Sequence, residues 1–195
     1  FSLRDQAGRD LQWEGDPAIW KGRAPILFPI VGALAGNQYR LDDRTYTLPR
    51  HGFARDKLFS LVEANRASVV FRLNWDEETL GLYPMRFQLD LHFEVVDVSL
   101  RIVATVRNLE DTTILPASFG FHPAFRWPLP FNGNRDAYFL VFEKDEPAPV
   151  RRLDAGGLLM PTGFATPVHN RKLHLTDGLF AADAIIFDNL VSRRI

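Results

Sequence analysis

The stretch Phe87–Arg107, FQLDLHFEVVDVSLRIVATVR, decides the fold. Apolar and polar side chains alternate over Phe87–Val95 and, less strictly, over Leu100–Val106. Because successive side chains of a strand point to opposite faces, this two-residue period predicts two half-buried strands. The short connection Val96-Asp97-Val98 predicts that they pair as an antiparallel hairpin.

Further strands are predicted wherever apolar runs lie between segments rich in Pro, Gly, Asn and Asp. These strands are Ser68–Leu73, Ser118–His122, Tyr138–Phe142 and Ala184–Phe187. A short helical turn is predicted from Thr176, and no long helical pattern competes with the strands. The sequence therefore predicts an all-β fold, a single antiparallel β-sandwich domain over residues 1–195, with long loops at Pro128–Asp136 and Glu143–Thr166.

Composition narrows the classes of partner. The net charge is -1, from 23 basic and 24 acidic residues. The chain therefore provides no electrostatic attraction to nucleic acid or to a membrane surface. The most apolar stretch, Ile26–Gly36, is much shorter than the roughly 20 residues of a membrane helix. The absence of cysteine excludes disulfides and thiolate metal sites, and it agrees with a cytoplasmic location. We expect a small, uncharged ligand.

Two compact segments are each centred on a histidine: Arg50-His51-Gly52-Phe53-Ala54-Arg55 and Gly120-Phe121-His122-Pro123-Ala124-Phe125. Imidazole exchanges a proton near neutral pH, and the neighbouring Gly, Pro and Phe residues can fix its position. In the predicted strand, His122 shares one face with Ser118 and Gly120, whose small side chains leave room for a ligand. The alternatives are a strand-capping His122 and a loop His51 between two surface arginines, Arg50 and Arg55.

The other histidines, His92, His169 and His174, have no metal-ligand spacing, and no metal site is predicted. The chain has no glycine-rich phosphate loop, no dinucleotide motif and no nucleophile elbow. Of the common kinds of enzyme chemistry, proton transfer without a cofactor is the one that the sequence leaves open. Trp20 and Trp127 each lie near a motif and offer flat faces to a sugar ring, although most tryptophans of an all-β fold belong to its core.

Five blocks together resemble the aldose 1-epimerase (galactose mutarotase-like) family, in particular its bacterial epimerase-like branch. They are Gly15-Asp16-Pro17 with Trp20, Gly22–Gly32 (GRAPILFPIVG), Leu48–Arg55 (LPRHGFAR), Tyr83-Pro84 and Gly120–Phe125 (GFHPAF). The resemblance implies a large antiparallel β-supersandwich whose cleft binds a monosaccharide and interconverts its α and β anomers. It also implies that His122 is the general acid, that His51 hydrogen-bonds the sugar, and that Asp183 holds sugar hydroxyls.

The family's general base is a glutamate in a Glu-Pro-Trp-like context near the C-terminus, and the printed sequence has no such motif. We also expect the family's last strands, and its first, to be missing. We therefore expect the sequence to be a fragment of a longer active protein, truncated at both ends. The alternatives are that the base was lost or that the printed sequence omits part of the natural protein.

The substrate stays open at this level. Arg23, Arg50 and Arg55 suit the phosphate of a hexose 6-phosphate, since guanidinium binds phosphate in a bidentate manner, but arginine also binds neutral sugars. A non-catalytic carbohydrate-binding sandwich would use the same arginines and aromatic residues, including Trp127. A structural or protein-interaction domain is a third alternative, and the oligomeric state is not predicted.

Overall fold

The computed structural model describes residues 2–195, which fall into two compact units. The mid-chain unit is Pro25–His122. The terminal unit joins the residues up to Ala24 to Pro123–Ile195. The prediction of one domain over residues 1–195 stays a prediction.

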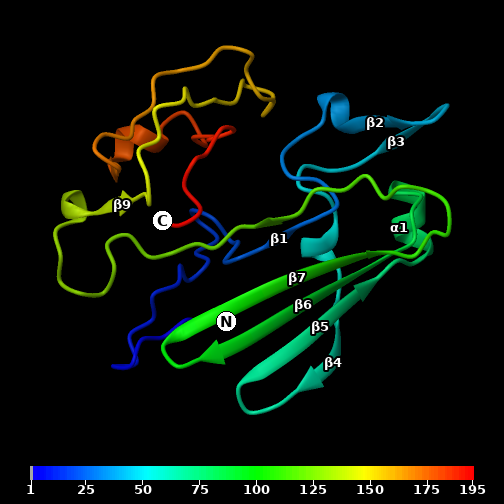
Figure 1. Cartoon of the computed structure of the whole chain (residues 1–195), viewed down its shortest axis with the longest axis horizontal. Helices are drawn as coiled ribbons and strands as arrows, with labels where there is room; N and C mark the ends of the chain where they lie inside the picture. Colours follow the sequence, from blue (N-terminus) through cyan, green and yellow to red (C-terminus); the bar gives the residue numbers. More distant parts are fainter. Residues whose placement is uncertain (1) are drawn as a thin grey trace. The chain divides into compact units, whose positions relative to one another are not determined.

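A four-stranded antiparallel sheet dominates the mid-chain unit (Figure 1). Its strands lie in the order β4-β5-β6-β7, with bounds Ser60–Ala64, Ser68–Asn74, Phe87–Val96 and Ser99–Asn108. β6 and β7 pair along their whole length, and Asp97 turns the chain between them with a φ of 52°. Asp tolerates this left-handed conformation better than most residues do. The predicted hairpin is confirmed.

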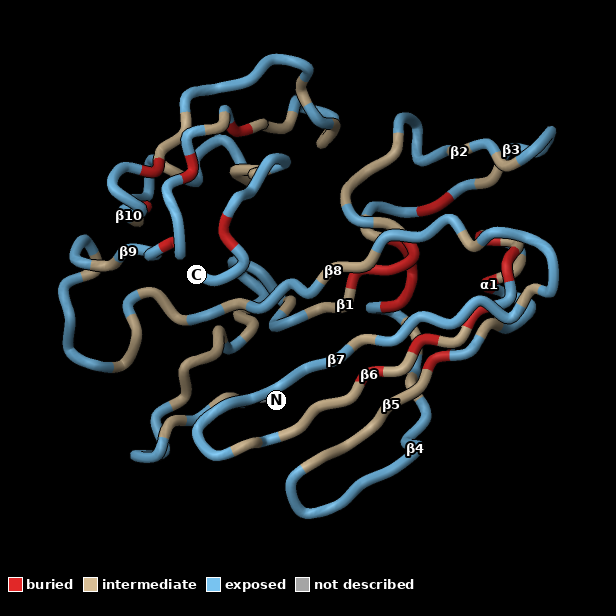
Figure 2. The backbone as a smooth tube through the Cα atoms, in the orientation of Figure 1, coloured by how far each residue is buried: buried red, intermediate tan, exposed pale blue. Residues whose placement is uncertain are grey.

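The core lies on one face of this sheet. Leu73, Phe87 and Leu89 are buried there, and the ring of Phe28 packs on Phe87 with 5.0 Å between centroids. Burying a side chain of this size contributes about 1.5–3 kcal/mol to stability. Figure 2 shows the buried positions of the sheet in β5 and β6, whereas β4 and β7 are largely exposed.

Short elements complete the mid-chain unit. They are β1 (Ile26–Leu27), η1 (Ala35–Asn37), β2 (Gln38–Leu41), β3 (Arg44–Thr47), η2 (Ala54–Asp56), α1 (Glu77–Leu82) and β8 (Gly120–Phe121). α1 begins with a capping box, in which Asp76 and Thr79 each accept a hydrogen bond from the other's backbone N–H at 2.7 and 2.8 Å. Sequence analysis does not predict α1, because six residues are too few to display a helical period.

The terminal unit has little regular structure. It contains η3 (Arg135–Ala137), β9 (Phe139–Val141), β10 (Lys172–His174) and η4 (Asp177–Phe180), and β9 pairs with β10 in antiparallel fashion. Phe142, Val168 and Leu173 form its buried core. Within residues 2–195, no helix has the length and apolar character needed to cross a membrane.

Most of the predicted elements are present, and the all-β antiparallel class is confirmed. The strand predicted at Ala184–Phe187 is wrong, because only Ile186 makes a bridge, with Arg151. Ser118–His122 is strand only over Gly120–Phe121, where it pairs with β1. The turn predicted from Thr176 is the 3-10 helix η4.

Candidate active site

The turn that carries His51 is held against the residues following β1. His51 and Gly52 both have a φ of 69°, in the left-handed region. A Cβ atom on Gly52 would lie 2.2 Å from the carbonyl oxygen of Phe28, so only glycine fits this position. The same oxygen accepts hydrogen bonds from the N–H groups of Phe53 and Ala54 at 3.0 and 3.2 Å. The backbone on both sides of His51 is thus fixed.

The imidazole of His51 is fixed as well. Its Nδ1 accepts a hydrogen bond from the N–H of Gly32 at 3.0 Å, and its own backbone N–H donates to the Gly32 carbonyl at 2.8 Å. The residue is half-buried. Two hydrogen bonds to one glycine therefore set both the position and the rotation of the ring.

His122 follows β8, which is anchored to the same Phe28–Gly32 segment. The N–H of Ser118 donates to the Pro29 carbonyl at 2.9 Å, and the Ser118 hydroxyl accepts from the Val31 N–H at 3.0 Å. A Cβ on Gly120 would lie 3.1 Å from a methyl group of Val31, so the strand and this segment are in close contact.

The rings of His51 and His122 lie 6.4 Å apart between centroids, with 72° between their planes. They lie far apart in the sequence. The structure therefore brings together the two histidines that the sequence singled out, both within the mid-chain unit.

Two predicted arginines lie on the His51 turn. The Nη2 of Arg55 donates to the carbonyl of Arg50 at 2.8 Å, and its Nε lies 3.7 Å from the Asp56 carboxylate. The Arg55 guanidinium is thereby kept beside the turn instead of extending into solvent. Arg50 itself is exposed.

The remaining predicted residues lie in the terminal unit, and their part in the site stays a prediction. Arg23 packs on Gly15, where a Cβ would lie 2.9 Å from its Nε. The ring of Trp127 has the Arg135 guanidinium stacked on one face, 3.6 Å from the centroid, and its Nε1–H donates to the Arg135 carbonyl at 2.9 Å. Asp183 is exposed and has a φ of 60°.

The residues that connect the two histidines are not predicted from the sequence. Ser118 is expected only as part of a small-residue floor, yet its hydroxyl accepts from the Val31 N–H, next to the Gly32 amide that donates to the His51 ring. The available signal is the block Gly22–Gly32, which belongs to the resemblance but contains no side chain that is predicted to transfer a proton. Nothing in its residue types predicts that its backbone holds His51.

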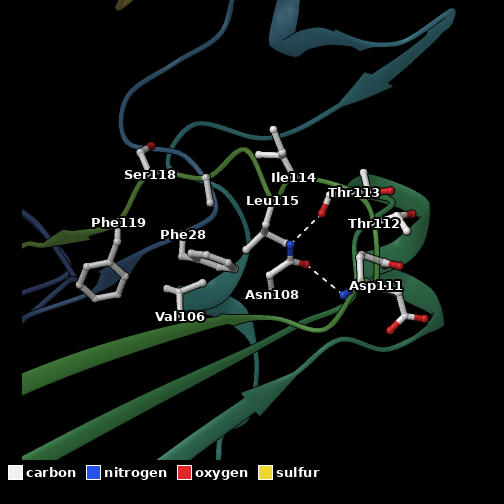
Figure 3. Close-up of a pocket in the computed structure, with 12 residues that line it drawn as sticks. Phe28, Val106, Asn108, Asp111, Thr112, Thr113, Ile114, Leu115, Ser118 and Phe119 are labelled. Atoms are coloured by element: carbon white, nitrogen blue, oxygen red, sulfur yellow. Dashed lines mark hydrogen bonds between the residues drawn. The ribbon is translucent and has the colours of Figure 1, made fainter.

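A cavity of about 570 Å³ lies in the same unit, between β7 and the chain that follows it (Figure 3). Asn108 braces its wall by donating to the Thr113 carbonyl at 2.7 Å and accepting from the Glu110 N–H at 3.0 Å. Phe28 and Ser118 line this cavity, but neither His51 nor His122 does. The cavity is therefore not lined by the two side chains for which the sequence predicts proton transfer. Among residues 2–195, His, Asp and Glu side chains form no group of three or more that could hold a metal ion.

With this geometry established, the comparisons with known proteins decide the family. The model of the family described as aldose 1-epimerase matches residues 1–191. The chain belongs to the aldose 1-epimerase family. It is 36% identical over 201 residues to the chromosomal protein LacX of Lactococcus lactis subsp. lactis, covering 100% of this chain and 67% of LacX.

Two solved structures share this epimerase-family fold. A galactose mutarotase related enzyme from Lactobacillus acidophilus has a TM-score of 0.84 and 29% identity, over 94% of this chain and 61% of that one. A galactose mutarotase-like protein from Lactobacillus casei ATCC 334 has a TM-score of 0.80 and 32% identity, over 94% of this chain and 63% of that one. The galactose mutarotase-like fold class is confirmed, and the chain spans somewhat less than two thirds of these two structures.

Proposed function

We propose that the protein is an aldose 1-epimerase, which interconverts the α and β anomers of a hexose by opening and closing its ring. The observation that carries this proposal is the pair of His51 and His122, 6.4 Å apart on a shared backbone support in a chain of this family. No cofactor is required, because the reaction consists of proton transfers and one reversible C–O bond cleavage.

In the proposed reaction His122 donates a proton to the ring oxygen while a base removes the proton from the anomeric hydroxyl. The bond between the anomeric carbon and the ring oxygen breaks, and the open-chain aldehyde forms. Rotation about the adjacent C–C bond presents the other face of the carbonyl. The two proton transfers then reverse, and the ring closes to the other anomer. His51 donates a hydrogen bond to a sugar oxygen near the reacting carbon.

The base is assigned by resemblance to a glutamate in a Glu-Pro-Trp-like context, which is not part of the printed sequence. Because the chain spans 61 to 67% of its relatives' lengths, the activity is proposed for the whole natural protein. Arg23, Trp127 and Asp183 are proposed as further sugar contacts, and a cytoplasmic location is proposed with them.

A hexose 6-phosphate is the second candidate substrate. Arg50 and Arg55 place two guanidinium groups on the turn of His51, where they can bind a phosphate attached to the same sugar. The interaction of Arg55 with Asp56 offsets part of this positive charge, so a neutral hexose remains the first choice. A sugar-binding protein without catalysis is the alternative from another class.

Exchange NMR on the natural full-length protein tests the function. Anomer interconversion of glucose, galactose and glucose 6-phosphate is measured with the wild type and with His122→Ala. We expect the wild type to accelerate at least one sugar, and the variant to lose about 10²–10⁴ of that rate. If the folded wild type binds a sugar and leaves its anomers at the rate of the buffer, the protein is a binding module and the proposal fails.

A further inference from the structure

We infer that the backbone amide of Gly32 holds His51 as the neutral tautomer protonated on Nε2, so that His51 donates a hydrogen bond but does not transfer a proton. Gly32, together with Ser118, which restrains the same segment, then positions His51 for the reaction. The inference rests on the proposed function for its consequence in catalysis, and on the geometry of the mid-chain unit for the tautomer itself.

The direction of one hydrogen bond fixes the tautomer. A neutral imidazole has one N–H donor and one bare nitrogen acceptor. The N–H of Gly32 can only donate, and it lies 3.0 Å from Nδ1 of His51. Nδ1 is therefore the bare nitrogen, and the ring proton resides on Nε2.

The same bond opposes a second proton on the ring. Protonation of Nδ1 would place its N–H against the N–H of Gly32, so that a hydrogen bond is replaced by contact between two donors. The left-handed turn of His51 and the bond from its N–H to the Gly32 carbonyl at 2.8 Å keep its backbone beside Gly32, so only rotation of the side chain could relieve this contact. His51 is therefore suited to donate a hydrogen bond from Nε2 throughout the reaction.

Ser118 holds the peptide that precedes the one on which this depends. Its hydroxyl accepts from the Val31 N–H at 3.0 Å, one residue before Gly32, and its own N–H donates to the Pro29 carbonyl at 2.9 Å. These two bonds tie the segment to the residues that precede His122, and Gly32, at the end of the same segment, holds His51. The Ser118 hydroxyl thus restrains the peptide next to the amide that selects the tautomer.

The two histidines then have different tasks. His51 donates through a fixed N–H, and proton transfer to the ring oxygen belongs to His122. A pair of interchangeable acids would instead require both rings to gain and lose protons.

NMR of the natural protein labelled with ¹⁵N-histidine tests the tautomer without reference to activity. Correlation of the ring nitrogens with the ring carbon-bound protons distinguishes a protonated from a bare nitrogen, and His51→Gln assigns the signals. At neutral pH we expect Nε2 to be protonated and Nδ1 to be bare. A His51 ring protonated on Nδ1 overturns the inference, whether or not the protein proves to be an epimerase.

A matched pair of amide substitutions tests the task of His51. Glutamine can place an N–H near the position of Nε2, whereas asparagine can only reach the position of Nδ1. We expect His51→Asn to lose about 10²-fold in kcat. We expect His51→Gln to retain a larger part of the rate with the pH profile of the wild type. If His51→Gln abolishes one limb of that profile, His51 transfers a proton and the inference is wrong.

Ser118→Ala tests the positioning role. Losing the hydroxyl releases the Val31 peptide, and we expect kcat to fall about 10-fold together with a mixture of His51 tautomers in the NMR spectrum. Ser118→Thr retains a hydroxyl and should restore both readouts, and Ser99→Ala, at the exposed start of β7, should alter neither. A His51 tautomer unchanged in Ser118→Ala excludes Ser118 from the positioning of His51.

Discussion

The α-carbon of Gly52 lies so close to the carbonyl oxygen of Phe28 that a methyl group added to it would stand 2.2 Å from that oxygen. Backbone atoms cannot move aside as the end of a flexible side chain can. The φ of 69° at Gly52 adds a second obstacle to any other residue. The position therefore offers a direct test of how rigidly the turn of His51 is held.

We expect Gly52→Ala to destabilise the protein by more than about 2 kcal/mol, or to prevent folding, since the clash and the positive φ act together. Gly81→Ala is the matched control, because Gly81 lies in α1 with no atom within 4 Å of the added Cβ. The control should stabilise by about 0.5–1 kcal/mol. Thermal and urea unfolding measure both variants, and similar stabilities for the two would contradict the observed contact.

Arg55 should reveal whether the substrate carries a phosphate. Removing a guanidinium that binds phosphate costs about 1.5–3 kcal/mol, which is roughly a 10- to 100-fold loss in kcat/KM. We expect Arg55→Ala to impose that loss on glucose 6-phosphate, if it is the substrate, and a smaller one on glucose. Arg66→Ala, in the exposed turn between β4 and β5, is the control. Equal losses for both sugars would show that Arg55 does not recognise a phosphate.

The buried carboxylate of Glu146 leads us to expect that the folded protein loses stability in acid. Its carboxylate is 3% exposed and accepts the N–H groups of Val191 and Ser192 at 2.9 and 2.6 Å. Burial alone would raise the pKa of Glu146, but the hydrogen bonds from Ser192 and Val191 outweigh it and hold the pKa below its usual range. A depressed pKa contributes stability above the ordinary value of about 4.5, and that contribution disappears as the pH falls through the lower folded value.

Glu146→Gln should therefore unfold several degrees below the wild type at pH 7, and the difference should shrink as the pH falls below about 4.5. Glu63→Gln, at an exposed position of β4, should change little at either pH. Thermal unfolding of the wild type and both variants, from pH 7 to below about pH 4.5, tests this expectation. A difference between Glu146→Gln and the wild type that grows in acid would contradict the assigned role.

The phenol of Tyr39 leads us to expect that the folded protein loses stability in alkali. Burial, reinforced by Tyr46, raises the pKa of Tyr39 from 10.0 to about 12, and its hydroxyl donates to the Leu82 carbonyl at 2.9 Å. Because the folded state favours the neutral phenol, its contribution is complete below pH 10 and is lost as the pH rises towards 12.

Tyr39→Phe should cost about 1 kcal/mol at neutral pH through the lost hydrogen bond and should reduce the sensitivity of unfolding to alkali. The tyrosinate absorbance of the wild type minus that of the variant isolates this phenol. An ionisation of Tyr39 near pH 10 in the folded protein would show that it is not buried as described.

The sheet and the histidine pair differ in how far the sequence predicts them. Alternation over Phe87–Val95 places β6 correctly because the side-chain period directly reports which face is buried. The histidines are predictable from residue type, since imidazole among Gly and Pro is unusual. Their proximity is not predictable from residue type, because it depends on backbone bonds made by Pro29, Val31 and Gly32.

The error at Ala184–Phe187 has a related origin. An apolar run predicts a strand only if a neighbouring strand is available to pair with it, and here a single bridge to Arg151 is formed. The Nη1 of Arg152 instead contacts the carbonyls of Asp183 and Ala184 at 3.5 and 3.4 Å. Such side-chain contacts to backbone carbonyls produce no periodic pattern in the sequence from which they could be predicted.

The segment Phe28–Gly32 supports both imidazole rings, those of His51 and His122, which come from distant parts of the chain. Because His51 bonds to this segment directly and His122 follows a strand that bonds to it, we expect thermal motion to alter the separation of the two rings less than the position of either ring. We therefore expect substitutions elsewhere in the sheet to shift the two rings together and to leave the distance between them unchanged.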